Sequence, residues 1–176
     1  MTQINEMVDH SPEKRKQCYI QARSFFYAAK RCGRIEICEE SGLNQNFPIP
    51  EYVNIAFSCE LYLKTLLYRD HEFIKGHELS ELFSRLDAAK IHKVSENLKI
   101  DEVQIRNLLE QHSNLFRNMR YRFEYLQYSG SFSVPLQFFY LMSESLDQLA
   151  QEAFGAEPYP STNVDIGYFH EFWLDF

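Results

Sequence analysis

Hydrophobic side chains recur every three or four residues along most of the chain, which is the period of an amphipathic α-helix. The first such segment begins near Ser11 and Pro12, where serine is a preferred N-cap residue and proline suits the first helical position. Further segments with this spacing lie at 51–68, 77–86, 101–128 and 134–154. Residues 88–98 fit either a short helix or a loop. The pattern predicts an all-α fold, a helical bundle of about five helices.

The stretches around these helices differ in composition. We expect residues 42–50 to form a loop, since Pro48 and Pro50 both oppose continuing a helix. Residues 155–176 are first loop-like and then aromatic and acidic. We expect this segment to dock on the bundle, because a freely exposed aromatic cluster would be a sticky patch. The predicted organisation is an N-terminal tail at 1–10, one bundle at 11–154 and an aromatic and acidic C-terminal segment at 155–176.

The composition and the residue spacings argue against a membrane protein, a metalloprotein and a cofactor-dependent protein. No apolar run approaches the roughly 18–20 residues of a membrane span, and residues 1–10 lack the apolar core of a signal peptide. We therefore expect a cytoplasmic protein without membrane contact. The four cysteines show no CxxC spacing and the six histidines no HxxH or HExxH spacing, so we expect buried thiols and no metal. There is no P-loop and no GxGxxG motif, and we expect no cofactor.

The charge is unevenly distributed. The net charge of −7 argues against a surface that coats nucleic acid broadly. Residues 13–34, however, hold seven basic side chains and one acidic side chain, which gives +6. Lys16, Arg23 and Lys30 recur every seven residues and so stay close to one line along the helix. This stripe is either a local anion-binding surface or simply a solvated charged face.

A cluster of arginines interleaved with aromatic residues lies in the segment 115–125. Arginine offers fixed donors for phosphate oxygens, and a neighbouring tyrosine ring can stack on a base. Arg120 and Glu124 are four residues apart and share a helix face. The alternative is that these two residues form an ion pair that closes a contact between helices. The members of the cluster are Arg117, Arg120, Tyr121, Arg122 and Glu124.

A second candidate site comprises Glu60 and Lys64, which stand one turn apart inside the otherwise apolar second helix. A charge in such a place is costly unless it is paired. Glu60 therefore pairs with Lys64, or bridges to an arginine of the fourth helix, or forms a polar pocket with Arg120. His77 follows Gly76 at the entrance of the third helix, where it is either a ligand-facing group or a capping and packing residue.

Residues 56–86, AFSCELYLKTLLYRDHEFIKGHELSELFSRL, together with Phe116 and the stretch 120–124, resemble the HEPN superfamily of small α-helical proteins. They are most similar to uncharacterised members with A-F-x-x-E-L-Y-L-K, K-G-H-x-L and R-Y-x-x-E motifs, over roughly residues 15–155. The resemblance implies a bundle of four or five helices that forms a homodimer, in a toxin–antitoxin or phage-defence context. Active members cut RNA without a metal, using an arginine followed four to six residues later by histidine. Here Arg120 is followed at those offsets by Glu124, Tyr125 and Leu126.

Three functions fit these features. The first is an HEPN-like module that binds RNA or a nucleotide. The second is a metal-independent RNA endonuclease, in which Arg120 stabilises the phosphorane charge and Glu124 or His77 is the acid or base. The third is a regulatory subunit that contacts a cognate protein. The sequence leaves open whether the protein is an enzyme. The residues we assign to catalysis are Arg120, Glu124 and Glu60, and those we assign to nucleic-acid binding are Arg117, Arg122, Tyr121, Lys64 and His77.

Overall fold

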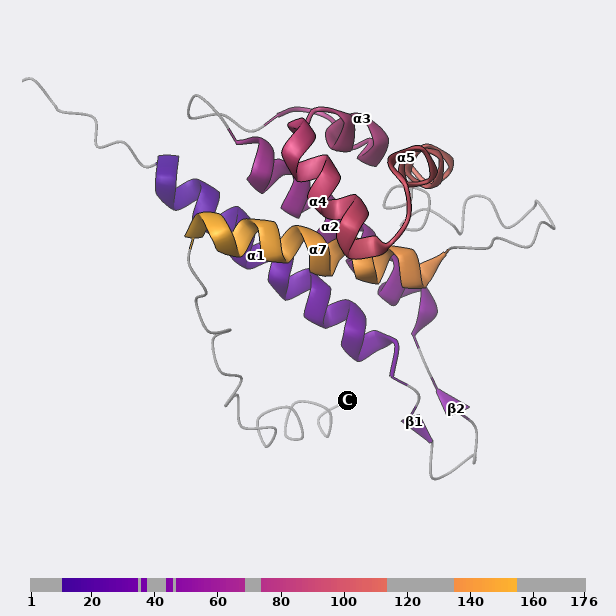
Figure 1. The fold of residues 1–176 in the computed structure, drawn as a ribbon. Helices are drawn as coiled ribbons and strands as arrows, with labels where there is room; N and C mark the ends of the chain where they lie inside the picture. The colour runs from indigo at the N-terminus through magenta and orange to yellow at the C-terminus, as the bar shows by residue number, and fades with distance from the viewer. Residues whose placement is uncertain are drawn as a thin grey trace, which may run out of the picture.

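The computed structural model describes residues 11–34, 36–37, 44–45, 47–68, 74–113 and 135–154. This part of the chain is an all-α helical bundle, as the periodicity predicts, with one antiparallel pair of two-residue strands between the first two helices (Figure 1). The elements are α1 (Ser11–Cys32), β1 (Glu36–Ile37), β2 (Asn44–Gln45), α2 (Pro48–Leu67), α3 (Leu79–Ser84), α4 (Ala88–Leu98), α5 (Glu102–Gln111) and α7 (Leu136–Phe154).

Helices α1 and α2 form an antiparallel hairpin, and the strand pair lies in the connection between them (Figure 1). Two buried hydrogen bonds fix their alignment. The Cys18 thiol donates to the carbonyl of Leu61 at 3.5 Å, and the Ser58 hydroxyl donates to the carbonyl of Ala22 at 2.9 Å. Small and short polar residues at these positions let the two helices approach closely.

Helix α7 packs along both helices of the hairpin, parallel to α2 and antiparallel to α1 (Figure 1). Its last residue, Phe154, stacks on Tyr19 near the start of α1 with the ring centroids 5.3 Å apart. In the middle of the contact, the Cys59 thiol and the Ser143 hydroxyl share a hydrogen bond of 3.0 Å. The start of α1 and the end of α7 therefore lie at the same end of the bundle.

Helices α3, α4 and α5 cover the hairpin and α7 from one side, with α3 on α2 and α4 on α7. They complete an aromatic and aliphatic core in which the largest fully buried side chains include Tyr62, Phe83, Phe139 and Met142. Helix α2 is the most apolar of the central helices, with twelve buried residues. Even so, none of the helices in the described ranges is long and apolar enough to cross a membrane.

Helix α2 begins at Pro48, three residues before the predicted start, so the expected loop at 42–50 is wrong at its end. Both Pro48 and Pro50 lie in the first turn of the helix. The first N–H groups of a helix have no intrahelical acceptor, so proline loses nothing there, and its fixed φ already suits the helix. The prolines therefore start this helix and do not delay it.

The single helix predicted over 101–128 is also wrong, because α5 ends at Gln111 and His112 leaves helical geometry with φ −117°. Because α5 ends here, Ser113 can accept hydrogen bonds from the first N–H groups of α3, which have no acceptor within their own helix. The Leu79 N–H donates to the carbonyl of Ser113 at 3.3 Å, and the Ser80 N–H donates to the Ser113 hydroxyl at 3.2 Å. Residues 114–134, where the prediction continued, lie outside the described ranges.

The ambiguous segment at 88–98 is a helix, α4. Asp87 caps it, since its side chain accepts a hydrogen bond from the Lys90 N–H at 2.9 Å. At the other end Lys99 adopts a left-handed conformation, with φ 57°, which terminates the helix. The third predicted helix, at 77–86, is shorter than expected, because α3 covers only Leu79–Ser84.

Candidate functional site

The candidate site is a polar cluster of three residues, Glu60, Lys64 and His77, which we call the Glu60 cluster. Glu60 lies on α2, and its side chain is only 1% exposed. Lys64, one turn further along α2, places its Nζ 2.8 Å from Glu60 Oε1. His77, from the stretch that precedes α3, places its Nδ1 2.8 Å from the same oxygen. Helix α2 thus supplies the carboxylate and the ammonium group, and a second segment supplies the imidazole.

Because the Glu60 carboxylate is buried, it needs partners that compensate its charge. Removing an ionised carboxylate from water is costly unless a charge and hydrogen bonds compensate it. Lys64 and His77 both contact Oε1, while Oε2 is buried and has no hydrogen-bond partner among the described residues. Within the described part of the chain, Lys64 and His77 are therefore the groups that compensate the buried carboxylate, and they do so through one of its two oxygens.

His77 differs from the other two members because its side chain is 70% exposed. The preceding Gly76 has φ +109°, a backbone conformation that glycine adopts without strain, and it turns the chain toward α3. Because Nδ1 faces a carboxylate, the imidazole donates there. Nε2 then accepts a proton when the ring is neutral and donates one when it is charged. The cluster thus presents an oriented imidazole to solvent.

The structure brings together three of the eight residues that the sequence marks as a site, namely Glu60, Lys64 and His77. It shows the pairing of Glu60 with Lys64 that the four-residue spacing allowed. The other five, Arg117, Arg120, Tyr121, Arg122 and Glu124, lie outside the described residues. The expected approach of Glu60 to Arg120 therefore stays a prediction. The described part of the predicted fourth helix, α5, packs on α3 and α4 and not along α2.

Sequence reasoning missed a second polar cluster, buried where α1, α2 and α7 meet. Arg23 Nε lies 3.6 Å from Asp147 Oδ1, and the two side chains are 12% and 16% exposed. The Tyr62 hydroxyl donates to the same oxygen at 3.1 Å, and the Gln151 amide donates to Oδ2 at 2.7 Å. Burial, with the Asp147 charge in addition, raises the pKa of Tyr19 to about 12.

This second cluster changes the interpretation of the basic stripe on α1. Arg23 pairs with Asp147, and Lys30 Nζ lies 3.0 Å from Glu144 Oε1. Both acids belong to α7, three residues apart. Two of the three stripe residues therefore attach α1 to α7 and are not free for an external anion. The signal that could have revealed this was the pair of acids, Glu144 and Asp147, which share one face of the otherwise largely apolar last helix.

The described residues contain no group of three or more His, Cys, Asp or Glu side chains that could hold a metal ion. What the Glu60 cluster can do is donate and accept hydrogen bonds and transfer a proton at His77. Protein-family models, curated proteins and solved structures were each compared with the chain, and none matches it. The assignment of the site accordingly rests on the chemistry of these residues.

Proposed function

We propose that the protein is an HEPN-like module that binds RNA or a nucleotide, with the Glu60 cluster as part of its binding surface. The observation that carries the proposal is the position of His77, which is hydrogen-bonded at 2.8 Å by a buried carboxylate and yet is 70% exposed. A histidine that serves only the core would be enclosed. An exposed imidazole with a fixed orientation is instead suited to meet a phosphate or a base edge.

The electrostatics support a local contact and not a broad one. The whole chain carries −7, so nonspecific attraction to a long polyanion is weak. Lys75 and His77 are two residues apart and both exposed, and His77 contacts Glu60, one turn before Lys64 on α2. In this proposal the arginines at 117, 120 and 122 add phosphate contacts, and Tyr121 adds a stacking surface. A short single strand or one nucleotide is the ligand that such a small surface fits.

A second candidate function is metal-independent RNA cleavage, and the contact between His77 and Glu60 is what favours it. A carboxylate that holds one ring nitrogen leaves the other to act as a general base. In such a reaction Nε2 takes the proton of a ribose 2′-hydroxyl, and the 2′-oxygen attacks phosphorus. The 5′-oxygen leaves with a proton from Glu124 or water, and a 2′,3′-cyclic phosphate forms. Arg120 would stabilise the charge on phosphorus.

Fluorescence anisotropy with a labelled single-stranded RNA, in EDTA, tests the first proposal. We expect His77→Ala to weaken binding about tenfold, the effect of losing one charge-assisted hydrogen bond worth about 1.4 kcal/mol. His92→Ala is the matched control, since the His92 side chain is 77% exposed and pairs with Glu96 on α4. The control should bind like the wild type. A wild type that does not bind RNA, or a His77→Ala variant with unchanged affinity, would reject the proposal.

The same samples decide between binding and cleavage. RNA that stays intact after prolonged incubation in EDTA supports binding alone. Products that end in a 2′,3′-cyclic phosphate, formed by the wild type and by His92→Ala but about 100-fold or more slowly by His77→Ala, would establish the second function.

A further inference from the structure

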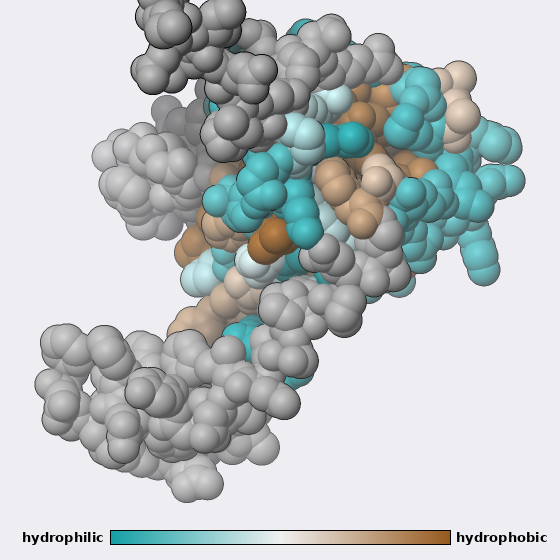
Figure 2. Space-filling view, turned by 90° about the vertical axis from the view of Figure 1, so that its left-hand side faces the viewer, coloured by the Kyte–Doolittle hydropathy of each residue, from teal (hydrophilic) through white to brown (hydrophobic). Residues whose placement is uncertain are grey.

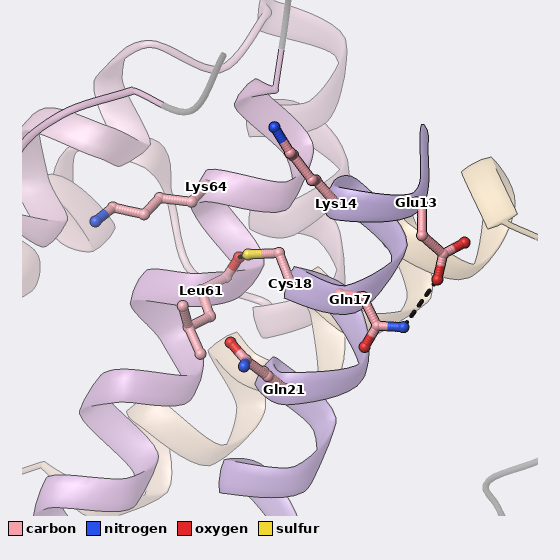
Figure 3. A pocket seen from close by; sticks show the side chains of 7 residues that line it. All are labelled: Glu13, Lys14, Gln17, Cys18, Gln21, Leu61 and Lys64. Carbon is pink, nitrogen blue, oxygen red and sulfur yellow. Dashed lines mark hydrogen bonds between the residues drawn. The ribbon is translucent and has the colours of Figure 1, made fainter. Parts of the chain in front are cut away.

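An open groove runs between α1 and α2 on the side of the hairpin that faces away from α7. It encloses about 590 Å³ and is lined by side chains between Glu13 and Gln21 of α1 and by Leu61 and Lys64 of α2. Figure 3 shows Cys18 and Leu61 between the two helices, with Lys64 extending across α2 away from α1. Since the Lys64 ammonium group faces Glu60, its methylene stem is what the groove receives. We call this feature the α1–α2 groove.

The groove has a mainly apolar lining and a polar edge. Cys18 and Leu61 form its deeper part and are each 8% exposed. Lys14 and Gln21 are exposed on the α1 side, and Glu13 is engaged by the Gln17 amide at 2.9 Å (Figure 3). Such a lining suits a segment with large apolar side chains, and the exposed Lys14 at the edge favours acidic neighbours.

The chain itself carries such a segment, and it leaves the bundle near the groove. Helix α7 ends at Phe154, whose ring stacks on Tyr19 at 5.3 Å and lies 4.9 Å from the Arg15 guanidinium carbon. Residues 155–176 therefore start beside the first half of α1, whose opposite side borders the groove. An extended stretch at 155–165 reaches up to about 36 Å, and a helix with its side chains is only about 10–12 Å across. The reach is sufficient.

The composition of this segment complements the groove. Residues 155–176 contain four acidic residues, no lysine or arginine, and six aromatic residues. Phe169, Phe172, Trp173 and Phe176 follow one another at spacings of three, one and three residues, so that they can form one apolar face. The start of α1 is basic at Lys14, Arg15 and Lys16. Figure 2 views the end of the molecule where α1 begins, and there hydrophobic surface is visible between hydrophilic side chains.

We propose that residues 155–176 of the same chain dock in the α1–α2 groove, with the aromatic face around Trp173 against Leu61 and Cys18 and with the acids near Lys14. The proposal is independent of any RNA binding. Docking removes both apolar surfaces from water, and this gain is roughly proportional to the apolar area covered. Because segment and groove belong to one molecule, the effective concentration of the segment is high.

Trp173 is the only tryptophan of the chain, so its fluorescence reports on the segment directly. We expect the Trp173 emission of the full chain to lie at shorter wavelength than that of a synthetic peptide of residues 155–176, and to resist quenching by iodide. The double variant Lys14→Glu/Gln21→Glu places acids at the edge of the groove, at two exposed positions. Its emission and quenching should approach those of the free peptide.

The matched control is Lys93→Glu/Gln104→Glu, which makes the same change of charge at exposed positions of α4 and α5. It should behave like the wild type, and far-ultraviolet circular dichroism should show equal helix content in all three proteins. Wild-type emission equal to that of the peptide would overturn the proposal. So would a groove variant that behaves like the control. A Trp173 signal that shifts on dilution would show that a second copy supplies the segment, and it too would overturn the proposal.

Discussion

At the scale of single residues, Gly33 and Glu51 show how closely α1 and α2 are fitted. Glu51 is 7% exposed in the first turn of α2 and accepts a hydrogen bond from the Tyr140 hydroxyl at 2.8 Å. A β-carbon added at Gly33 would lie 2.2 Å from Glu51 Oε1, so the carboxylate would have to move. The glycine is therefore needed for space, just after the end of α1.

We predict that Gly33→Ala lowers the free energy of unfolding by about 1–2 kcal/mol, because the displaced carboxylate loses the bond to Tyr140. Urea denaturation measures the change. In a Glu51→Ala background the obstacle is gone, so the same substitution should cost less than about 0.5 kcal/mol. Equal costs in both backgrounds would show that the Glu51 contact is not what the glycine accommodates.

The Glu60 cluster shows how much of a site a sequence reveals. A glutamate and a lysine four residues apart in an apolar helix must pair or find other partners, so the contact of Glu60 with Lys64 is predictable. The meeting of Glu60 with His77 is not, since the two are seventeen residues apart and their approach depends on the path of residues 74–78. Arg23 was misjudged for a related reason, because helical spacing does not say which partner helix lies opposite.

At the scale of elements, the boundaries of helices follow tertiary contacts that periodicity does not record. The apolar spacing continues past Gln111, yet α5 ends there and Ser113 turns to α3. The Ser113 hydroxyl is within 2.6 Å of the Ser80 hydroxyl and accepts from the Ser80 N–H. Ser113, just past the end of α5, thus caps the start of α3. The apolar positions predict that both helices exist, but not where they end.

We expect Ser113→Ala to destabilise the protein by about 1–2 kcal/mol, since it leaves a backbone N–H at the start of α3 without its acceptor. Ser84→Ala is a suitable control, because Ser84 is exposed and its hydroxyl donates to the nearby carbonyl of Glu81 in the same helix. That change should stay within about 0.5 kcal/mol. Thermal melts compare the two. If both variants melted together, the cap would contribute nothing measurable.

At the scale of the whole molecule, buried titratable groups set the pH range in which the bundle is stable. Burial raises the pKa of the Cys59 thiol from 9.0 to about 12, and it raises the pKa of Tyr19 from 10.0 to about 12. Burial disfavours the charged thiolate and phenolate, so the folded state favours the neutral, protonated form of both groups. Burial also lowers the pKa of His112 from 6.5, and there the folded state favours the neutral ring.

These shifts predict a loss of stability on both sides of neutrality. The contribution of Cys59 and Tyr19 is complete below pH 9 and is lost as the pH rises toward about 12. The contribution of His112 is complete above pH 6.5 and declines as the pH falls below it. Urea denaturation midpoints, measured at pH values from below 6.5 to above 9, report this loss of stability. Tyr19→Phe, which keeps the ring stack on Phe154, should flatten the alkaline decline, and an unchanged slope would contradict the assignment.

We propose above that His77, held by Glu60, lies at the ligand-binding surface. Nuclear magnetic resonance of the imidazole groups during titration with a short single-stranded RNA tests this most directly, because each histidine reports separately. We expect the His77 ring signals to shift and saturate with the RNA, while those of His92 stay in place. If the His77 signals do not move, or if His77 and His92 shift equally, the Glu60 cluster is not where RNA binds.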